Sequence, residues 1–372
     1  MNLFHNPRWA LSASLLLLVV VVFGLEACGH SEAAPAEIPM DTVMQTVRSY
    51  GRGHQGTPAP ALAGLPDTAV ATYVDHVRNL LDQGDYAELE SLAQTNRLER
   101  GRFVAGNWRN NDFFNAVCLL DSRDDVKDSD YQKQFDKLNK WQAVRPESAA
   151  ARIALAKLYL FYADFARGTG YADAVSNNQW RKHRERTALA KQSLLEAARL
   201  KERDPHWYLV MQGVAHNEGW EKTDARELLE LALAFEPDYF HFYRTYATYL
   251  LPQWYGGPGE LQAFAEEVAA KHPEPAGSIL YFQILSSLAC YCRREAEELP
   301  HADWQKLQLG FANLQKNYGL SDLNANRLAE MAYVFGDKAT ARDAFSRITK
   351  RETSVWLTEE SFQCAKNWAT SP

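Results

Sequence analysis

One loop of the sequence concentrates aromatic, proline and glycine residues. It lies within Leu250 to Glu267, which reads LLPQWYGGPGELQAFAEE. Pro252 ends the helical pattern, and the glycines that follow can adopt backbone angles that other residues avoid. Trp254 and Tyr255 are then presented on a turn, where their rings can stack on a ligand. The alternative is that Trp254 folds back into the core, with its indole N–H bonded to a backbone carbonyl.

A second loop offers a positive charge. It reads ARGTGYA and contains Arg167 and Tyr171. No strand precedes its GTG, and neither common phosphate-loop pattern is completed, so nucleotide binding is not predicted. Arg167 can instead pair with a carboxylate or with a ligand anion. If the two loops lie on the same edge of the fold, Arg167, Tyr171, Trp254 and Tyr255 line one ligand site.

Tyrosines form a third candidate, in the stretch DYFHFYRTYATYL. Tyr239, Tyr243 and Tyr246 share one face of the predicted helix. Inner helices of repeat proteins grip peptides with such residues, because tyrosine gives rigid contact area at small entropic cost. The alternative is that these rings pack in the core.

Catalytic signatures are missing from the sequence, which contains no HExxH, GxSxG, CxxC or EF-hand pattern. No catalytic residue, metal ligand or cofactor is therefore predicted. The alternative from another class is a glycoside-processing enzyme on an α/α toroid, for which Glu260, Glu266 and Asp238 are the candidate carboxylates. A toroid closes around an aromatic and acidic pit, whereas a solenoid stays open.

The elements that position these residues are helices almost throughout, because apolar residues recur every three or four positions. Val70–Leu81 and Ala87–Arg97 are predicted helices joined by a turn at Gly84 and Asp85. Near the other end, Leu323–Val334 and Ala339–Ile348 are joined in the same way by Gly336 and Asp337.

Prolines punctuate the middle of the chain. Pro146, Pro205, Pro237 and Pro273 each close one predicted helix and open another. The last three are separated by 32 and 36 positions, which is room for one helical hairpin each. The pattern resembles tetratricopeptide repeats, whose period is about 34 residues. It predicts an all-α protein, an α-solenoid of tetratricopeptide-like hairpins over 67–372, with a possible N-terminal part 67–140 and repeat core 146–350.

A narrower likeness rests on four stretches: RPESAAARIALAKLYLFYADFARGTGYADAV, DPHWY, LLPQWYGGPGELQAFAEEVA and AGSILYFQI. Over roughly Asp67 to Gln283 they resemble the bacterial family called domain of unknown function 4034. The resemblance implies a tetratricopeptide-like fold. It implies no particular biochemical activity.

The N-terminus has the form of a secretory signal, with Arg8 before an apolar run from Ala10 to Phe23. Its ending, LEAC, resembles a bacterial lipobox, which predicts lipidation of Cys28, although Glu26 departs from the usual pattern. Ordinary secretion or an uncleaved anchor are the alternatives. Residues 1–28 are thus the predicted signal, and the Pro-, Gly- and Ala-rich 29–66 a tether. Folding is predicted to begin near Asp67.

Charge and cysteine content restrict the partners. The net charge of −7 provides no basic field for nucleic acid. An exported location permits disulfides, but the pairing of Cys118, Cys290, Cys292 and Cys364 is left open. We therefore expect a non-enzymatic protein in the bacterial cell envelope, membrane-anchored or periplasmic. We expect it to act as a scaffold that binds a protein or peptide partner.

Overall fold

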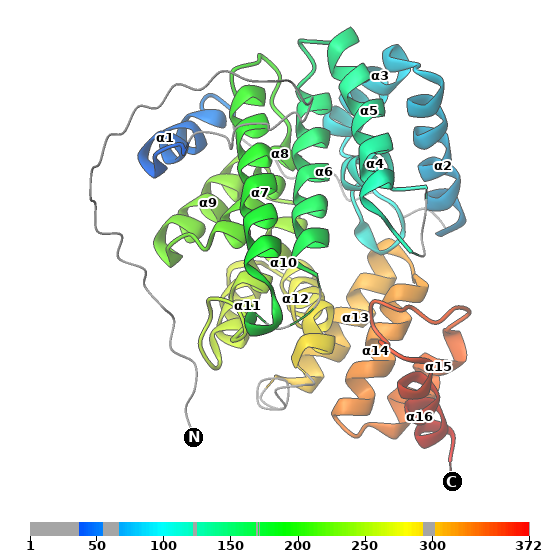
Figure 1. Cartoon of the computed structure of the whole chain (residues 1–372). Coiled ribbons are helices and arrows are strands. Elements are labelled where there is room, and N and C mark those ends of the chain that lie inside the picture. The colour runs from blue at the N-terminus through cyan, green and yellow to red at the C-terminus, as the bar shows by residue number, and fades with distance from the viewer. Residues whose placement is uncertain are drawn as a thin grey trace, which may run out of the picture. The chain divides into compact units, whose positions relative to one another are not determined.

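The computed structural model describes residues 37–54, 67–121, 125–168, 170, 172–292 and 302–371. These residues form sixteen α-helices and no strand, which confirms the all-α prediction (Figure 1). Every one of these helices falls within the compact unit Pro35–Pro372. Within the described ranges, no helix has the length and apolar character needed to cross a membrane.

The helices in chain order are α1 (Met40–Tyr50), α2 (Asp67–Gln83), α3 (Tyr86–Glu99), η1 (Val104–Gly106), α4 (Arg109–Cys118), α5 (Asp128–Val144), α6 (Ala149–Arg167), η2 (Ala172–Ala174), α7 (Asn177–Ala197), α8 (Pro205–Glu218), α9 (Lys222–Phe235), α10 (His241–Tyr249), α11 (Glu260–Lys271), α12 (Ala276–Cys292), α13 (Trp304–Tyr318), α14 (Asp322–Val334), α15 (Lys338–Arg347) and α16 (Glu359–Thr370).

Both predicted Gly-Asp turns are present. Gly84 and Gly336 adopt positive φ angles of 73° and 70°, which glycine tolerates without a steric cost. Asp85 then caps α3 by accepting a hydrogen bond from the Glu88 amide, and Asp337 caps α15 in the same way with Thr340. Each turn therefore reverses the chain and starts the next helix within two residues.

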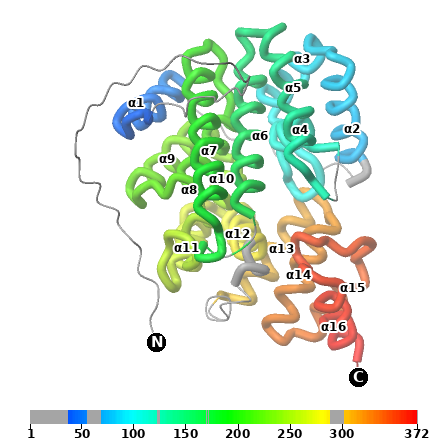
Figure 2. The backbone as a smooth tube through the Cα atoms, in the orientation of Figure 1, coloured from blue at the N-terminus to red at the C-terminus, as the bar shows by residue number. Residues whose placement is uncertain are grey.

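The prolines also lie where predicted, between successive helices. Pro205 occupies the first turn of α8, directly after the cap Asp204. Successive helices pack as neighbours, which gives a solenoid-like arrangement. In addition, α4, α6, α8, α10, α12 and α14 contact one another in that order. We call these six helices the inner row; Figure 2 shows their backbone.

The tether predicted for 29–66 is wrong at 40–50, where α1 forms and packs against α9 (Figure 2). Its buried residues are Val43, Met44, Val47 and Tyr50, which have the spacing of one helical face. The Tyr50 ring stacks on Trp207 at 4.0 Å, and its hydroxyl accepts a hydrogen bond from the Asp204 amide. This short amphipathic helix was not predicted, because the prolines and glycines on both sides of it indicate a flexible tether. Residues 1–36, including Cys28, and 55–66 lie outside the described residues.

A bridge joins segments far apart in the sequence. The loop that contains η1 contacts α13. Arg102 donates a hydrogen bond to the hydroxyl of Tyr318 at 2.9 Å, and its guanidinium also lies over the rings of Trp108 and Phe240. From α12, the Gln283 amide reaches the Ala105 carbonyl. The start of the inner row is thereby tied to its later helices.

Candidate functional site: a polar cavity along the inner row

A cavity of about 740 Å³ follows the inner row, and all six of its helices contribute to the lining. Helix α7 and the α10–α11 loop complete the wall. The lining is rich in asparagine, histidine and arginine, and it contains two carboxylates, Asp112 and Asp164. A volume of this size is typical of ligand-binding pockets, which place a few polar groups in a concave surface.

Arg167 contacts two tryptophans at the cavity. Its guanidinium carbon is 5.4 Å from the Trp180 ring centroid and 5.1 Å from that of Trp254. Each distance is within the range of a cation–π interaction, and a guanidinium has five N–H donors, more than these contacts use. One donor, NH1, bonds the Gly168 carbonyl at 3.1 Å, whereas Nε has no partner among the described residues. We call Arg167, Trp180 and Trp254 the arginine stack.

Trp254 is half-buried and is part of the cavity wall. Its ring meets the imidazole of His216 edge-on at 4.6 Å. Its ring also packs against the core, and its indole N–H bonds no carbonyl within the part of the chain that the structure describes. The turn depends on Gly256, because a Cβ there would lie 1.7 Å from the Leu250 carbonyl oxygen.

Tyr255 also lines the cavity, and it braces the wall. Its hydroxyl donates a hydrogen bond to the His216 carbonyl at 2.8 Å, near the C-terminal end of α8. The ring stacks on Tyr249 at 4.7 Å. It also passes close to Gly219, the left-handed residue that ends α8. This residue therefore has a structural role in holding α8 and the α10–α11 loop together.

Three of the four residues predicted to share a site do lie together, because Arg167, Trp254 and Tyr255 all line this cavity. Tyr171 lies outside the described residues. The geometry thus brings the two loops to one place, as expected for loops on the same edge of the array.

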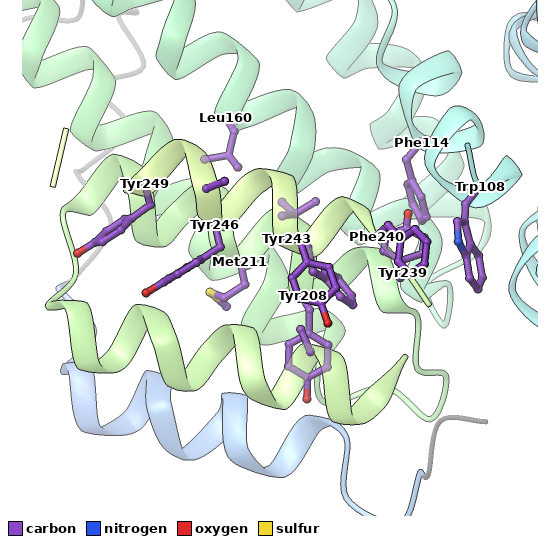
Figure 3. Packing of buried hydrophobic residues seen from close by; sticks show 14 of the residues in the cluster. Trp108, Phe114, Leu160, Tyr208, Met211, Tyr239, Phe240, Tyr243, Tyr246 and Tyr249 are labelled. Atoms are coloured by element: carbon purple, nitrogen blue, oxygen red, sulfur yellow. The ribbon is translucent and has the colours of Figure 1, made fainter. Parts of the chain in front are cut away.

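The tyrosine stripe is not a binding face. Tyr239, Tyr243 and Tyr246 are all buried, and Figure 3 shows them packed among other core side chains. Tyr239 hydrogen-bonds the His206 ring and Tyr243 the His272 ring, at 2.9 and 2.7 Å. The expected exposed gripping face is therefore not formed by these three residues, because their side chains are buried. Tyrosines at helical spacing serve here to fill the interfaces of α10.

A second group of charged residues lines the cavity on α4 and α10. Arg244 donates a hydrogen bond from NH2 to Nδ1 of His241 at 2.5 Å. Burial lowers the pKa of Arg244 to about 10, although the charge of Asp112 opposes this shift. Burial also raises the pKa of Asp112 to about 6, against the opposing effects of Asn115 and Lys157. We call Asp112, His241 and Arg244 the arginine–aspartate end.

A chain of buried hydrogen bonds lies next to the arginine–aspartate end, on the side away from the cavity. Lys157 donates to Asn115 Oδ1 at 2.7 Å and lies 3.1 Å from Nε2 of His206. His206 in turn meets the Tyr239 hydroxyl. Burial lowers the pKa of Lys157 to about 8 and holds the pKa of His206 well below its usual value. The imidazole is therefore neutral, and the network fixes Asn115 in the cavity wall.

The other carboxylate, Asp164, lies near the arginine stack. Its side chain is 62% exposed, yet protein atoms surround the cavity and raise its pKa to about 6. His183 Nε2 lies 3.8 Å away, and burial lowers the pKa of this histidine to about 4. At neutral pH the contact thus joins a carboxylate to an uncharged ring, so it is not an ion pair.

Most of the lining was not predicted from the sequence, including Asp112, Asp164, His216 and Arg244. Their signal is a polar stripe at helical spacing that recurs on successive helices: Asn111, Asp112 and Asn115 on α4, Asp164 and Arg167 on α6, His216 and Asn217 on α8, and His241, Arg244, Thr245 and Thr248 on α10. On a helix whose opposite face is apolar, such a stripe faces water or a ligand.

The carboxylates proposed for the enzyme alternative lie elsewhere. Glu260, Glu266 and Asp238 are absent from the cavity wall. Lys222 bonds Glu260 at 2.7 Å and holds its pKa below the usual value, and Lys306 pairs with Glu266. A general acid needs a raised pKa, which Glu260 therefore lacks. Glu260, Glu266 and Asp238 therefore do not form a carboxylate pair in this cavity.

The two cysteines whose side chains are described are both free thiols. Cys118 is a buried free thiol and Cys364 an exposed one; the side chains of Cys290 and Cys292 lie outside the description. No group of three or more potential metal ligands gathers among the residues that were described.

Comparison of the chain with protein-family models, curated proteins and solved structures gave no match.

Proposed function

We propose that this chain is a helical-repeat binding protein that holds a polar ligand in the inner-row cavity, without transforming it. The observation that carries the proposal is the arginine stack, in which Arg167 contacts two tryptophans at a cavity of about 740 Å³ and its Nε has no partner among the described residues. Pre-ordering of donors lowers the entropic cost of binding. It has no evident value to a purely structural spacer.

The partner that we propose is a short polar peptide or a comparable component of the bacterial envelope. An extended peptide groove is not favoured, because the tyrosines expected to line it are buried. The concave polar cavity suits a compact segment instead. Export, and membrane anchoring through lipidated Cys28, remain part of this proposal on the strength of the N-terminal sequence.

Ligand capture from an envelope extract tests this function. The full chain is incubated with the peptide and small-molecule fraction, and bound species are identified by native mass spectrometry. We expect a bound species with wild type, and its loss in Arg167→Gln. The matched control is Arg181→Gln, an exposed arginine that directly follows Trp180 in the chain and pairs with Glu185. Binding unchanged in Arg167→Gln, with melting also unchanged, would reject the cavity as the site.

Glycoside processing remains a second candidate for one reason. Asp112 and Asp164 both line the cavity, and burial raises the pKa of Asp112 to about 6, as a general acid requires. The test is hydrolysis of a panel of aryl glycosides by wild type and by the Asp112→Asn and Asp164→Asn variants. Hydrolysis lost in either variant supports the enzyme, and a wild type inactive on the whole panel rejects it.

A further inference from the structure

Arg244 is a cation without an anionic partner. Among the described residues, no carboxylate oxygen lies within ion-pair distance of its guanidinium, and its hydrogen bonds go to the neutral ring of His241. Some other arginines of this protein do have a carboxylate partner: Arg226 contacts Glu267 at 2.5 Å and Arg100 contacts Glu236 at 3.0 Å. Buried charges are normally compensated, so an uncompensated one beside a cavity points to an anion supplied by a ligand.

The surroundings of Arg244 add further positive charge. Arg327 on α14 lines the same cavity, and Lys157 lies behind Asn115. Asp112 is the carboxylate that acts on Arg244 electrostatically, and no ion pair joins the two side chains in the described structure. One oxygen of Asp112, Oδ2, has no hydrogen-bond partner among the described residues. The cavity wall thus holds a cation and an acceptor that do not pair with each other.

A single ligand group satisfies both. A carboxylate receives the guanidinium fork of Arg244, while an N–H or O–H on the neighbouring carbon donates to Asp112. Asn111 and Asn115, from the same face of α4, supply amides beside the two charges. An inorganic anion such as phosphate fits less well, because its larger negative charge would face the Asp112 carboxylate.

We propose that the arginine–aspartate end binds the carboxylate of an α-amino or α-hydroxy acid, with the α-substituent donating to Asp112. The proposal rests on the proposed binding function and specifies its ligand. The same chemistry occurs in a free acid and in the last residue of a peptide. The experiment therefore includes both sources.

The test uses the full chain and a panel of compounds that differ by one group, with binding followed by saturation-transfer NMR. L-alanine and L-lactate carry both groups, propionate lacks the donor, L-alaninamide lacks the carboxylate, and glycyl-alanine represents a peptide end. We expect the two complete acids or the dipeptide to bind. Propionate should bind about tenfold more weakly, the effect of one charge-assisted hydrogen bond, and alaninamide not detectably.

The Arg244→Gln variant separates this role from a structural one. Because the charge is uncompensated, its removal should leave the melting temperature unchanged or raise it, while binding of the complete acids falls at least about tenfold. Arg244→Lys should recover part of the binding. Arg199→Gln, at an exposed position outside the cavity, is the matched control and should bind as wild type does.

Three outcomes overturn the proposal: alaninamide binding as tightly as alanine, Arg244→Gln binding as wild type does, or no compound of the panel binding. Phosphate competing as well as lactate would also overturn it. A species captured from the envelope extract through Arg167, with no response to the panel, would remove this proposal and leave the proposed function standing. Binding of the dipeptide alone assigns the peptide source, and binding of alanine or lactate the free acid.

Discussion

The guanidinium of Arg167, at the end of α6, lies 5.1 Å from the ring centroid of Trp254, in the loop between α10 and α11. This contact brings two loops that are distant in the sequence to one cavity. It also separates the roles of neighbouring aromatics: Trp254 faces the cavity, whereas Tyr255 holds the loop to α8 through the His216 carbonyl. The first residue is placed to affect binding, and the second to affect folding.

Trp254→Ala should lower the free energy of unfolding by less than the 3–5 kcal/mol that is typical when a buried tryptophan is lost. Its ring is half-buried and its N–H makes no bond in the described structure, so little core packing disappears. Trp207→Ala is the matched variant, since Trp207 is fully buried and donates to the Leu194 carbonyl. Urea denaturation measures both. Equal losses would place Trp254 in the core.

Gly256→Ala should destabilise the protein more than Gly259→Ala. The added Cβ at position 256 would lie 1.7 Å from the Leu250 carbonyl oxygen, so the loop backbone has to move. At Gly259, where φ is +78° and nothing lies within 4 Å, only the left-handed conformation is penalised, by about 1–2 kcal/mol. Thermal melts of the two variants give the comparison. The reverse order would mean that the turn differs from the one described.

Tyr50→Ala should cost about 3 kcal/mol or more of stability, because its buried ring stacks on Trp207 and its hydroxyl bonds the Asp204 amide. A residue in a flexible tether would show no such effect. Chemical denaturation measures the loss, with exposed Arg52→Ala as the control from the same end of α1. A variant as stable as wild type would favour the interpretation of this segment as a flexible tether.

Asp112→Asn should change how stability depends on pH. The folded-state pKa of Asp112, about 6, lies above its ordinary value of 3.8, so the folded state retains a proton that the unfolded chain releases. Stability contributed by the protonated form is therefore present below pH 4 and lost as the pH rises toward 6. The groups acting on this carboxyl are Asn111 and Asn115 on its own helix, Lys157 from α6 and Arg244 from α10.

The measurement is the difference in unfolding free energy between the variant and wild type across this range. We expect the difference to grow in favour of Asp112→Asn from about pH 4 to about pH 6 and to stay level above. Taking a difference matters, because His183, with a pKa lowered to about 4, produces a slope of opposite sign in both proteins. A flat difference would show that Asp112 titrates normally.

Local sequence signals predicted the helices well. Gly-Asp turns and proline-initiated helices depend on backbone angles and caps set by neighbouring residues, and both are present at Asp85, Pro205 and Asp337. Trp254 and Arg167 were identified because unusual loops are visible in a linear sequence. Which face of a helix is enclosed depends on packing between distant helices, so tyrosines and polar residues at the same spacing could not be told apart. The tyrosines fill interfaces, whereas Asp112 and Arg244 line the cavity.

The bridge from Arg102 to Tyr318 affects how the folded helices unfold. In a linear array each repeat touches only its neighbours, so the ends can fray while the centre stays folded. Here a contact spanning 216 positions links the loop before α4 to the end of α13. Opening either segment breaks contacts of the other, so α4 through α13 should exchange amide protons as one cooperative unit. Helices α14 to α16 come after this bridge in the chain. They are therefore the helices that can unfold separately from α4 through α13.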